Sequence, residues 1–239
     1  MKSLKKLLIL FMVIFCISMI NVTSVFAEES TEITPAEDFK FRYMWFSGDS
    51  ANKMIILDKY VGDEDVEKIV IPETYMDNGV ERKVVEVGYE CFSGLTNLKS
   101  ITLPSTITAI GTESFKNCTS LEKVEGLVEC DGFFIGKRAF TGCTSLNEFP
   151  IYENVEYDVW AYAFENTPWY ENLVENDTDN IIMIGTTIVD MNDCSGDVKI
   201  PENATKIVNS AFCQDEEGEV PTINHNITSV YIPVWPSRV

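Results

Sequence analysis

The residues that could perform catalysis are few in this chain and match no common catalytic pattern. His225 is the only histidine among 239 residues, which excludes paired-histidine chemistry and histidine-based metal clusters. There is no G-x-S-x-G elbow, Walker loop, dinucleotide fingerprint or H-E-x-x-H motif. A Cys–His dyad is compatible with the composition. His225 falls in a predicted loop near the end of the chain, however, and the exported cysteines have structural explanations, so we expect no catalytic residues and no cofactor.

The cysteines raise the questions of disulfides and of metal binding. Cys118 and Cys143 each lie three residues after a phenylalanine that we place at the same position of neighbouring repeats. Such residues would be about 4.8 Å apart with parallel side chains, which disfavours the disulfide torsion. We favour buried free thiols, and no C-x-x-C pair indicates zinc. The exported cysteines are Cys91, Cys118, Cys130, Cys143, Cys194 and Cys213.

Carboxylates are abundant, and two kinds of chemistry follow from them. Paired carboxylates could serve a glycosidase, but 38 acidic residues make any one pairing uninformative. Clustered carboxylates could hold calcium. Their spacing matches no calcium loop, so we interpret them as solvated turns and expect no metal. The clusters are Asp63-Glu64-Asp65 and the set Asp177, Asp179, Asp190 and Asp193.

The first residues have the pattern of an export signal. Lys2, Lys5 and Lys6 precede an apolar run, and Val25-Phe26-Ala27 supplies the small residues of a cleavage site. We therefore expect residues 1–27 to be a signal peptide, with no stable membrane span after its removal. Cys16 raises the alternative of a lipoprotein, but Val13-Ile14-Phe15 lacks the small residues that should precede a lipidated cysteine. A secreted or cell-surface location follows.

Charge limits the partners of the exported chain. Removal of residues 1–27 leaves 15 basic against 38 acidic residues, a formal charge of −23 over 212 residues. Such a surface repels phosphate backbones, so nucleic acid is excluded as a partner. Hydrophobic residues make up 45% of the sequence, which argues against disorder. We expect a folded domain or one array of repeats.

A period of roughly 24 residues organises the chain. Phenylalanines recur as anchors, and one repeat between the fourth and the fifth has lost its anchor. Each anchor follows a small residue, and an aliphatic residue lies five positions before it. The anchors are Phe92, Phe115, Phe140, Phe164 and Phe212; the small residues are Cys91, Ser114, Ala139, Ala163 and Ala211; the aliphatic residues are Val87, Ile110, Ile135, Val159 and Ile207.

Short strands are predicted in the same phase. In Leu98–Pro104, Ile101 and Leu103 alternate with Ser100 and Thr102, the period of a half-buried strand, and related strands end at Ile71-Pro72, Phe149-Pro150, Ile200-Pro201 and Ile232-Pro233. Stacked repeats would bury these stripes in one continuous core. We predict a β-rich solenoid of about six or seven coils over residues 58–239, with strands on its concave face. Residues 28–36 are expected to be a disordered leader and residues 37–57 an N-terminal cap.

These columns resemble the BspA-type leucine-rich repeats of bacterial surface proteins. The resemblance is carried by Leu98–Gly111 (LKSITLPSTITAIG), Glu113–Leu121 (ESFKNCTSL) and Arg138–Leu146 (RAFTGCTSL), and it covers about residues 55–235. Ala163–Leu173 (AFENTPWYENL) is similar to a variant coil of the family in which Thr-Pro-Trp replaces the usual turn. Trp160 departs from the pattern, because it replaces the column glycine of Gly88, Gly111 and Gly136. The resemblance implies that the fold is a β-rich leucine-rich-repeat solenoid. It also implies a secreted or surface protein used in adhesion and partner binding.

We expect binding on the strand face, where outward side chains of successive coils align. The partner would be an extracellular protein or glycan, and the alternative function is a secreted hydrolase acting on glycans or peptides. A second group, Tyr152, Tyr157, Trp160, Tyr162, Trp169 and Tyr170, could stack on sugars or anchor an interface, but we interpret it as packing of the variant coil. The strand-face candidates are Lys68, Val70, Ser100, Thr102, Lys123, Glu125, Glu148, Asp197, Lys199, Ser229 and Tyr231.

Overall fold

The computed structural model describes residues 32–44, 54–127, 132–191, 193–214, 222–223 and 227–231. The chain divides into two units, Met1–Glu32 and Ile33–Val239, and almost all described residues belong to the second. The predicted signal peptide lies outside the described residues. Within the described ranges, no helix is both long and apolar enough to cross a membrane.

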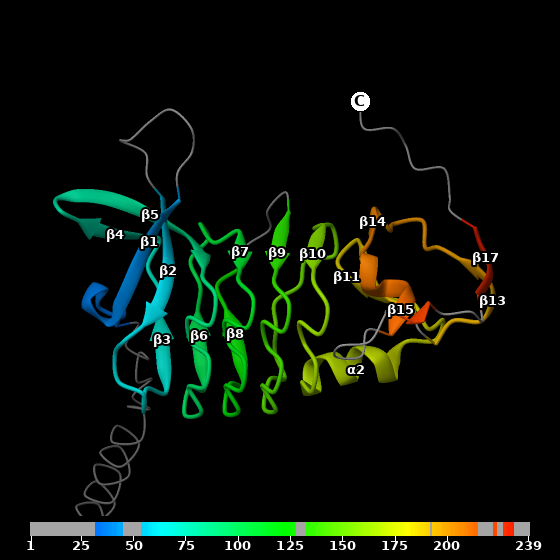
Figure 1. Cartoon of the computed structure of the whole chain (residues 1–239), viewed down its shortest axis with the longest axis horizontal. Helices are drawn as coiled ribbons and strands as arrows, with labels where there is room; N and C mark the ends of the chain where they lie inside the picture. Colours follow the sequence, from blue (N-terminus) through cyan, green and yellow to red (C-terminus); the bar gives the residue numbers. More distant parts are fainter. Residues whose placement is uncertain are drawn as a thin grey trace, which may run out of the picture. The chain divides into compact units, whose positions relative to one another are not determined.

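Two antiparallel hairpins open the second unit (Figure 1). The 3-10 helix η1 (Ala36–Asp38) leads into β1 (Phe39–Met44), which pairs with β2 (Met54–Tyr60). Strand β4 (Thr74–Asp77) pairs with β5 (Val80–Val87) through the turn Asn78-Gly79. Both turn residues have positive φ, 49° and 79°, the backbone conformation for which Asn-Gly is preferred in tight hairpins.

A first ladder of parallel strands joins equivalent residues of successive repeats. It contains β3 (Lys68–Val70), β6 (Ser100–Thr102) and β8 (Lys123–Glu125), and a single bridge extends it from Lys123 to Glu148. The central residues Ile69, Ile101 and Val124 are 0–3% exposed. Strands β3 and β8 follow the predicted alternation, whereas in β6 the predicted outward residue Ser100 is buried as well.

A second ladder runs through another side of the same repeats. Strand β5 pairs in parallel with β7 (Ala109–Ile110), which pairs with β9 (Phe133–Ile135), which pairs with β10 (Tyr157–Val159). Strand β2 pairs with the other edge of β5, and β1 is the outermost strand on that side. The register aligns the predicted aliphatic column, Val87, Ile110, Ile135 and Val159, and all four side chains are buried.

The anchor phenylalanines form a stack through the core. Ring centroids are 5.0 Å apart for Phe92 and Phe115, 5.0 Å for Phe115 and Phe140, and 5.2 Å for Phe140 and Phe164. All four are at most 3% exposed. The small residues that precede them are buried as well, because the neighbouring repeat lies directly against the backbone there. Phe212 is the last residue of the 3-10 helix η2 (Asn209–Phe212), and its side chain is not among those that the structure describes.

The column glycines are required by close backbone approach. A Cβ on Gly111 would lie 2.8 Å from the carbonyl oxygen of Val87, and one on Gly88 would lie 2.7 Å from that of Leu57. A Cβ on Gly136 would collide with the backbone nitrogen of Thr112. Real side chains do not tolerate such contacts, so glycine lets successive repeats stack closely.

Two irregular repeats place other residues at the anchor position. In regular repeats the anchor amide donates to the carbonyl of the small residue in the next repeat, as from Phe92 to Ser114 at 2.8 Å. Tyr60 donates in the same way to Cys91, at 3.0 Å, and Met191 donates to Ala211, at 2.8 Å. Met191 is fully buried and fills the position of the lost phenylalanine, a role that suits its flexible side chain.

The C-terminal part contains a helix and several short strands. Helix α2 (Pro168–Asn176) begins at the N-cap Thr167, and β11 (Ile182–Ile184), β12 (Thr187–Asp190) and β14 (Lys206–Ile207) form one sheet. A second hydrophobic cluster surrounds Ile188, Met191 and Ile200. The remaining pairs are β13 (Gly196–Lys199) with β17 (Ile227–Tyr231), and β15 (Cys213–Gln214) with β16 (Thr222–Ile223).

Part of the predicted disordered leader makes defined contacts in the structure. The leader was predicted to extend through residue 36, but Thr34 is only 8% exposed and its backbone amide donates to Val70 at 2.9 Å. The Thr34 hydroxyl also accepts from the Val70 amide, at 3.0 Å. Thr34 therefore covers the edge of β3 with which no other described strand pairs. In the predicted cap, Phe39 packs against Phe92, whereas Trp45 and Phe46 lie outside the described residues.

Candidate functional site

The first ladder brings seven of the predicted strand-face residues into two rows. One row contains Lys68, Ser100, Lys123 and Glu148, and the other contains Val70, Thr102 and Glu125. Glu148 is exposed and five of the others are partly exposed. Ser100 is the exception at 8% exposed, so its hydroxyl is not offered to a ligand as the sequence suggested.

Four further candidates lie on a separate sheet. Strand pairing sets Asp197 beside Ser229 and Lys199 beside Tyr231. The Ser229 hydroxyl donates to Asp197 Oδ1 at 2.7 Å, and Tyr231 is 64% exposed. These residues are exposed as predicted, but no described strand pairing connects them to the first ladder.

Opposite charges are paired on the first ladder. Lys123 Nζ lies 2.9 Å from Glu125 Oε1, with both side chains about two-fifths exposed. Just before β6, Lys99 Nζ lies 2.8 Å from Glu67 Oε2, and this hydrogen bond raises the pKa of Lys99. Exposed pairs of this kind contribute little to stability, so their side chains are available to rearrange around a partner.

The second ladder presents an outward row that the sequence analysis missed. The register aligns Glu86, Ala109, Phe134 and Asp158. Three of these residues lie between two buried residues of their strand, and Ala109 is the first residue of β7. Burial raises the pKa of the Glu86 carboxyl, opposed by the nearby Arg42. In β9 all three residues are apolar, which hid the alternation. The signal that could have revealed this ladder was the aliphatic column, which we used only for the core.

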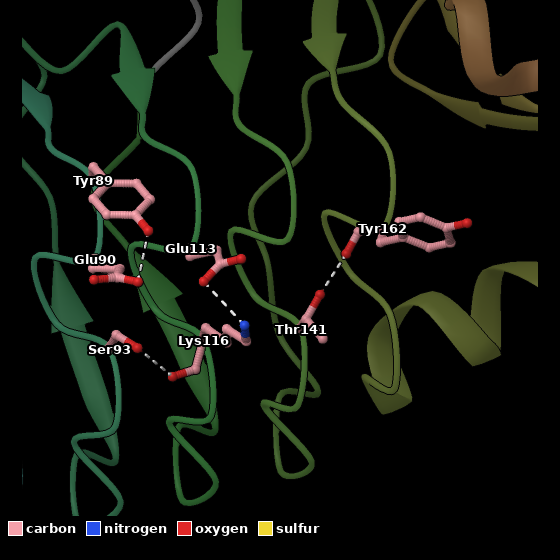
Figure 2. Close-up of polar contacts among 7 residues, drawn as sticks. All are labelled: Tyr89, Glu90, Ser93, Glu113, Lys116, Thr141 and Tyr162. Atoms are coloured by element: carbon pink, nitrogen blue, oxygen red, sulfur yellow. Dashed lines mark hydrogen bonds and ion pairs between the residues drawn. The ribbon is translucent and has the colours of Figure 1, made fainter. Parts of the chain in front are cut away.

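The turns around the anchors carry a third set of polar contacts (Figure 2). Tyr89 donates to Glu90 Oε1 at 2.8 Å, and Lys116 Nζ lies 3.0 Å from Glu113 Oε2. Ser93 donates to the Lys116 carbonyl, and Thr141 donates to the Tyr162 carbonyl. The last two bonds join successive repeats, so this surface is used largely to hold the turns together.

The same turns repeat a left-handed backbone position. Glu90, Glu113, Arg138 and Tyr162 have φ values of 52° to 60°. A side chain in this region costs about 1–2 kcal/mol. The amides of Glu90, Glu113 and Arg138 each donate to a carbonyl of the following repeat, at 2.9–3.2 Å. The conformation is therefore stabilised by stacking between repeats.

The described cysteines are free and buried. Cys91, Cys118, Cys143 and Cys194 form no disulfide, as we favoured from the sequence. Cys118 Sγ donates to the Phe92 carbonyl at 3.1 Å, and Cys143 Sγ donates to that of Phe115 at 3.0 Å. Burial raises the pKa of the Cys91 thiol, so it is a poor nucleophile. Cys130 lies outside the described residues, as does the side chain of Cys213.

The acidic clusters act locally in turns. Asp63 Oδ1 accepts from the Asp65 amide at 2.9 Å, and Asp177 Oδ2 accepts from the amides of Asp179 and Ile181. In the part of the chain that the structure describes, no three His, Cys, Asp or Glu side chains are arranged to hold a metal ion. His225 lies outside that part.

The predicted aromatic group separates into core and surface members. Tyr157 is 2% exposed, Trp169 packs against Phe164 at 4.6 Å, and Tyr170 donates to Asp190 at 3.3 Å. Tyr152 donates to the Leu127 carbonyl at 2.6 Å. These four pack the variant coil as we interpreted from the sequence. Trp160 does not, because it is 54% exposed.

Strand ladders that join equivalent positions, together with stacked anchors, define a β-rich repeat protein. A family-model comparison agrees: the BspA type leucine rich repeat region matches residues 66–182 and 132–233 in six copies. The chain belongs to this family. The comparison indicates no enzyme family, and none of the curated proteins searched matches the sequence.

Several solved structures of bacterial leucine-rich-repeat proteins are similar to this chain. A leucine rich cell surface protein of Faecalibacterium prausnitzii is 20% identical, with a TM-score of 0.49, covering 83% of this chain and 54% of its own. The T. pallidum leucine rich repeat protein is 19% identical, with a TM-score of 0.41, covering 74% and 82%. A leucine-rich repeat protein of Bacteroides capillosus is 27% identical, with a TM-score of 0.43, covering 56% and 95%. The chain thus spans about half the length of the first of these.

Proposed function

We propose that this chain is a non-catalytic binding protein that works outside the cell and binds an extracellular protein through the outward residues of the first ladder. The observation that carries the proposal is the register of β3, β6 and β8, which lines up Lys68 with Lys123 and Glu148, and Val70 with Thr102 and Glu125. A row of this kind repeats at the strand spacing of about 4.8 Å and so offers a regular polar surface.

The chemistry of the rows favours a protein ligand on this ladder. Their side chains are charged, hydroxyl-bearing or aliphatic, with no aromatic member, so stacking on sugar rings is not available there. Charged side chains of both signs give orientation and specificity at protein interfaces. The solenoid architecture, the concavity of this face and a count of about six or seven coils are part of the proposal, as is export through residues 1–27.

The test is binding of the purified chain to a panel of extracellular matrix proteins, comparing wild type with a triple variant, Lys123→Ala/Glu125→Ala/Glu148→Ala. Saturable binding that the variant weakens by about tenfold or more is expected, since several contacts are removed at once. Both proteins should unfold at similar urea concentrations, because exposed ion pairs add little stability.

A matched control changes the same charges elsewhere. Arg42→Ala/Asp58→Ala/Glu64→Ala also removes one cation and two carboxylates, including an exposed ion pair of 3.1 Å. This control should bind like wild type. Equal losses of affinity in both variants would show that overall charge, and not the first ladder, governs binding. Hydrolysis of a glycan or peptide by the wild type would overturn the proposal, because the protein would then be an enzyme.

A further inference from the structure

Trp160 is the residue whose placement the fold does not explain. The equivalent positions Gly88, Gly111 and Gly136 have no room for a Cβ atom, yet this repeat carries the largest side chain there. Trp160 keeps the backbone bond of its column, from its amide to the Ile135 carbonyl at 2.9 Å. Its indole is 54% exposed and so adds little to the core. The glycine of this column is thus replaced without a gain in core packing, and such departures from a repeat pattern are typical of functional positions.

The indole has an aromatic neighbour on the outward row of the second ladder. The ring of Phe134 lies 5.6 Å from that of Trp160 between centroids, at an interplanar angle of 71°. Phe134 is itself only partly buried, and its other neighbour in the row is the small residue Ala109. Phe134 belongs to β9 and Trp160 directly follows β10, and these two strands lie side by side (Figure 1). The contact between the two rings therefore gives an apolar platform at this part of the surface.

A polar pair borders this platform. Asp158 is the register partner of Phe134, and its Oδ1 lies 3.1 Å from Lys206 Nζ. The two side chains are 46% and 30% exposed, so both can still reach a ligand. A carboxylate accepts and an ammonium donates, so together they can bind neighbouring hydroxyl groups through charge-assisted hydrogen bonds.

We propose that Phe134, Asp158, Trp160 and Lys206 form a binding platform for a neutral carbohydrate chain. Aromatic faces carry negative electron density and attract the weakly positive C–H bonds on the face of a sugar ring. The charges of Asp158 and Lys206 balance, and the chain as a whole carries a formal charge of −20, so a neutral sugar is favoured over an anionic one.

The size of the platform also favours a sugar over a protein. A stable protein interface buries about 800 Å² on each partner, with a cluster of anchors at its centre. Two rings and one ion pair offer much less, but they match the dimensions of one or two sugar residues. This site is separate from the first ladder and does not depend on the function proposed for it.

The experiment is calorimetric titration of the purified chain with hexasaccharides of glucose, mannose, galactose and N-acetylglucosamine. At least one should bind with a Kd of about 0.1–1 mM. Trp160→Gly, which restores the glycine of the other repeats, should weaken that binding by about tenfold or more, and Asp158→Asn should weaken it while leaving both rings in place. Tyr89→Ser removes another exposed aromatic residue and should bind like wild type.

The outcomes separate this proposal from the first. The triple variant of the first ladder should keep its affinity for the sugar, whatever happens to its protein binding. The platform proposal is overturned if no hexasaccharide binds at about 10 mM, or if Trp160→Gly binds as tightly as wild type. It is also overturned if Trp160→Gly no longer binds the protein ligand but still binds the sugar, since the indole would then contact a protein.

Discussion

At the scale of single residues, burial decides what the polar groups of this chain can do. Glu86 shows this most clearly, because its carboxyl lies in the outward row of the second ladder but is still partly removed from water. The buried thiols follow the same logic, since Cys118 and Cys143 each donate to a carbonyl of the preceding repeat and are not left as reactive groups.

Replacement of Glu86 by glutamine should change how stability depends on pH. Burial raises the pKa of this carboxyl in the folded state, so the folded protein holds the proton more tightly. The group's favourable contribution is therefore present below its unfolded pKa and is lost as pH rises through the folded value. We expect Glu86→Gln to gain about 0.5 kcal/mol relative to wild type between pH 4 and pH 7, a modest value because the side chain is only partly buried.

Urea unfolding at both pH values measures this difference. Glu64→Gln is the control, because Glu64 is exposed, and its stability relative to wild type should stay nearly constant. A Glu86→Gln protein whose stability relative to wild type is the same at pH 4 and pH 7 would contradict the assignment.

At the scale of elements, the ends of the ladders need special residues because strand edges leave backbone groups unpaired. Thr34 fulfils this function at the edge of β3, where its amide and hydroxyl satisfy the carbonyl and amide of Val70. The Tyr75 hydroxyl in turn donates to the Thr34 carbonyl at 2.9 Å. A single residue outside any strand thus takes the place of a neighbouring strand.

Thr34→Ala should destabilise the protein by about 1–2 kcal/mol, because it removes the acceptor of the partly buried Val70 amide and leaves that amide unsatisfied. Thr34→Ser keeps the hydroxyl and should lose less than half as much. Thermal or urea unfolding of the two variants checks the prediction. Equal losses would indicate that the methyl group, and not the hydrogen bond, matters at this position.

At the scale of the whole molecule, the described chain contains two hydrophobic clusters. The larger contains the anchor stack and both ladders, and the smaller surrounds Ile188 and Met191. Repeat proteins are stabilised mainly by contacts between neighbouring repeats, so damage should remain local.

Two core substitutions test this locality. Phe115→Leu breaks the middle of the stack and should cost about 1–2 kcal/mol, and Ile188→Val in the second cluster should cost about 1 kcal/mol. Hydrogen exchange should quicken around β6–β9 in the first variant and around β12–β14 in the second. Uniform acceleration in both would mean that the clusters unfold as one cooperative unit.

The sequence by itself determined the repeat, its phase and most of its core. A period of about 24 residues requires only that equivalent positions be buried to the same extent. Burial restricts the residue types at these positions so strongly that the period can be recognised in the sequence alone. The family, the anchor column, the aliphatic column and the burial of Ile101 were all predictable for this reason. The paired alignment of Lys68 with Lys123 followed from the same phase.

Only the tertiary structure decided where the irregular positions lie. Tyr60 and Met191 take anchor positions through backbone hydrogen bonds to the next repeat, and no periodic signal marks them. The second ladder was hidden because β7 has only two residues and all three residues of β9 are apolar, so the sequence shows no alternation there. Whether an aromatic side chain is core or surface depends on what packs over it, so Trp169 and Trp160 look alike in sequence but differ in the folded chain.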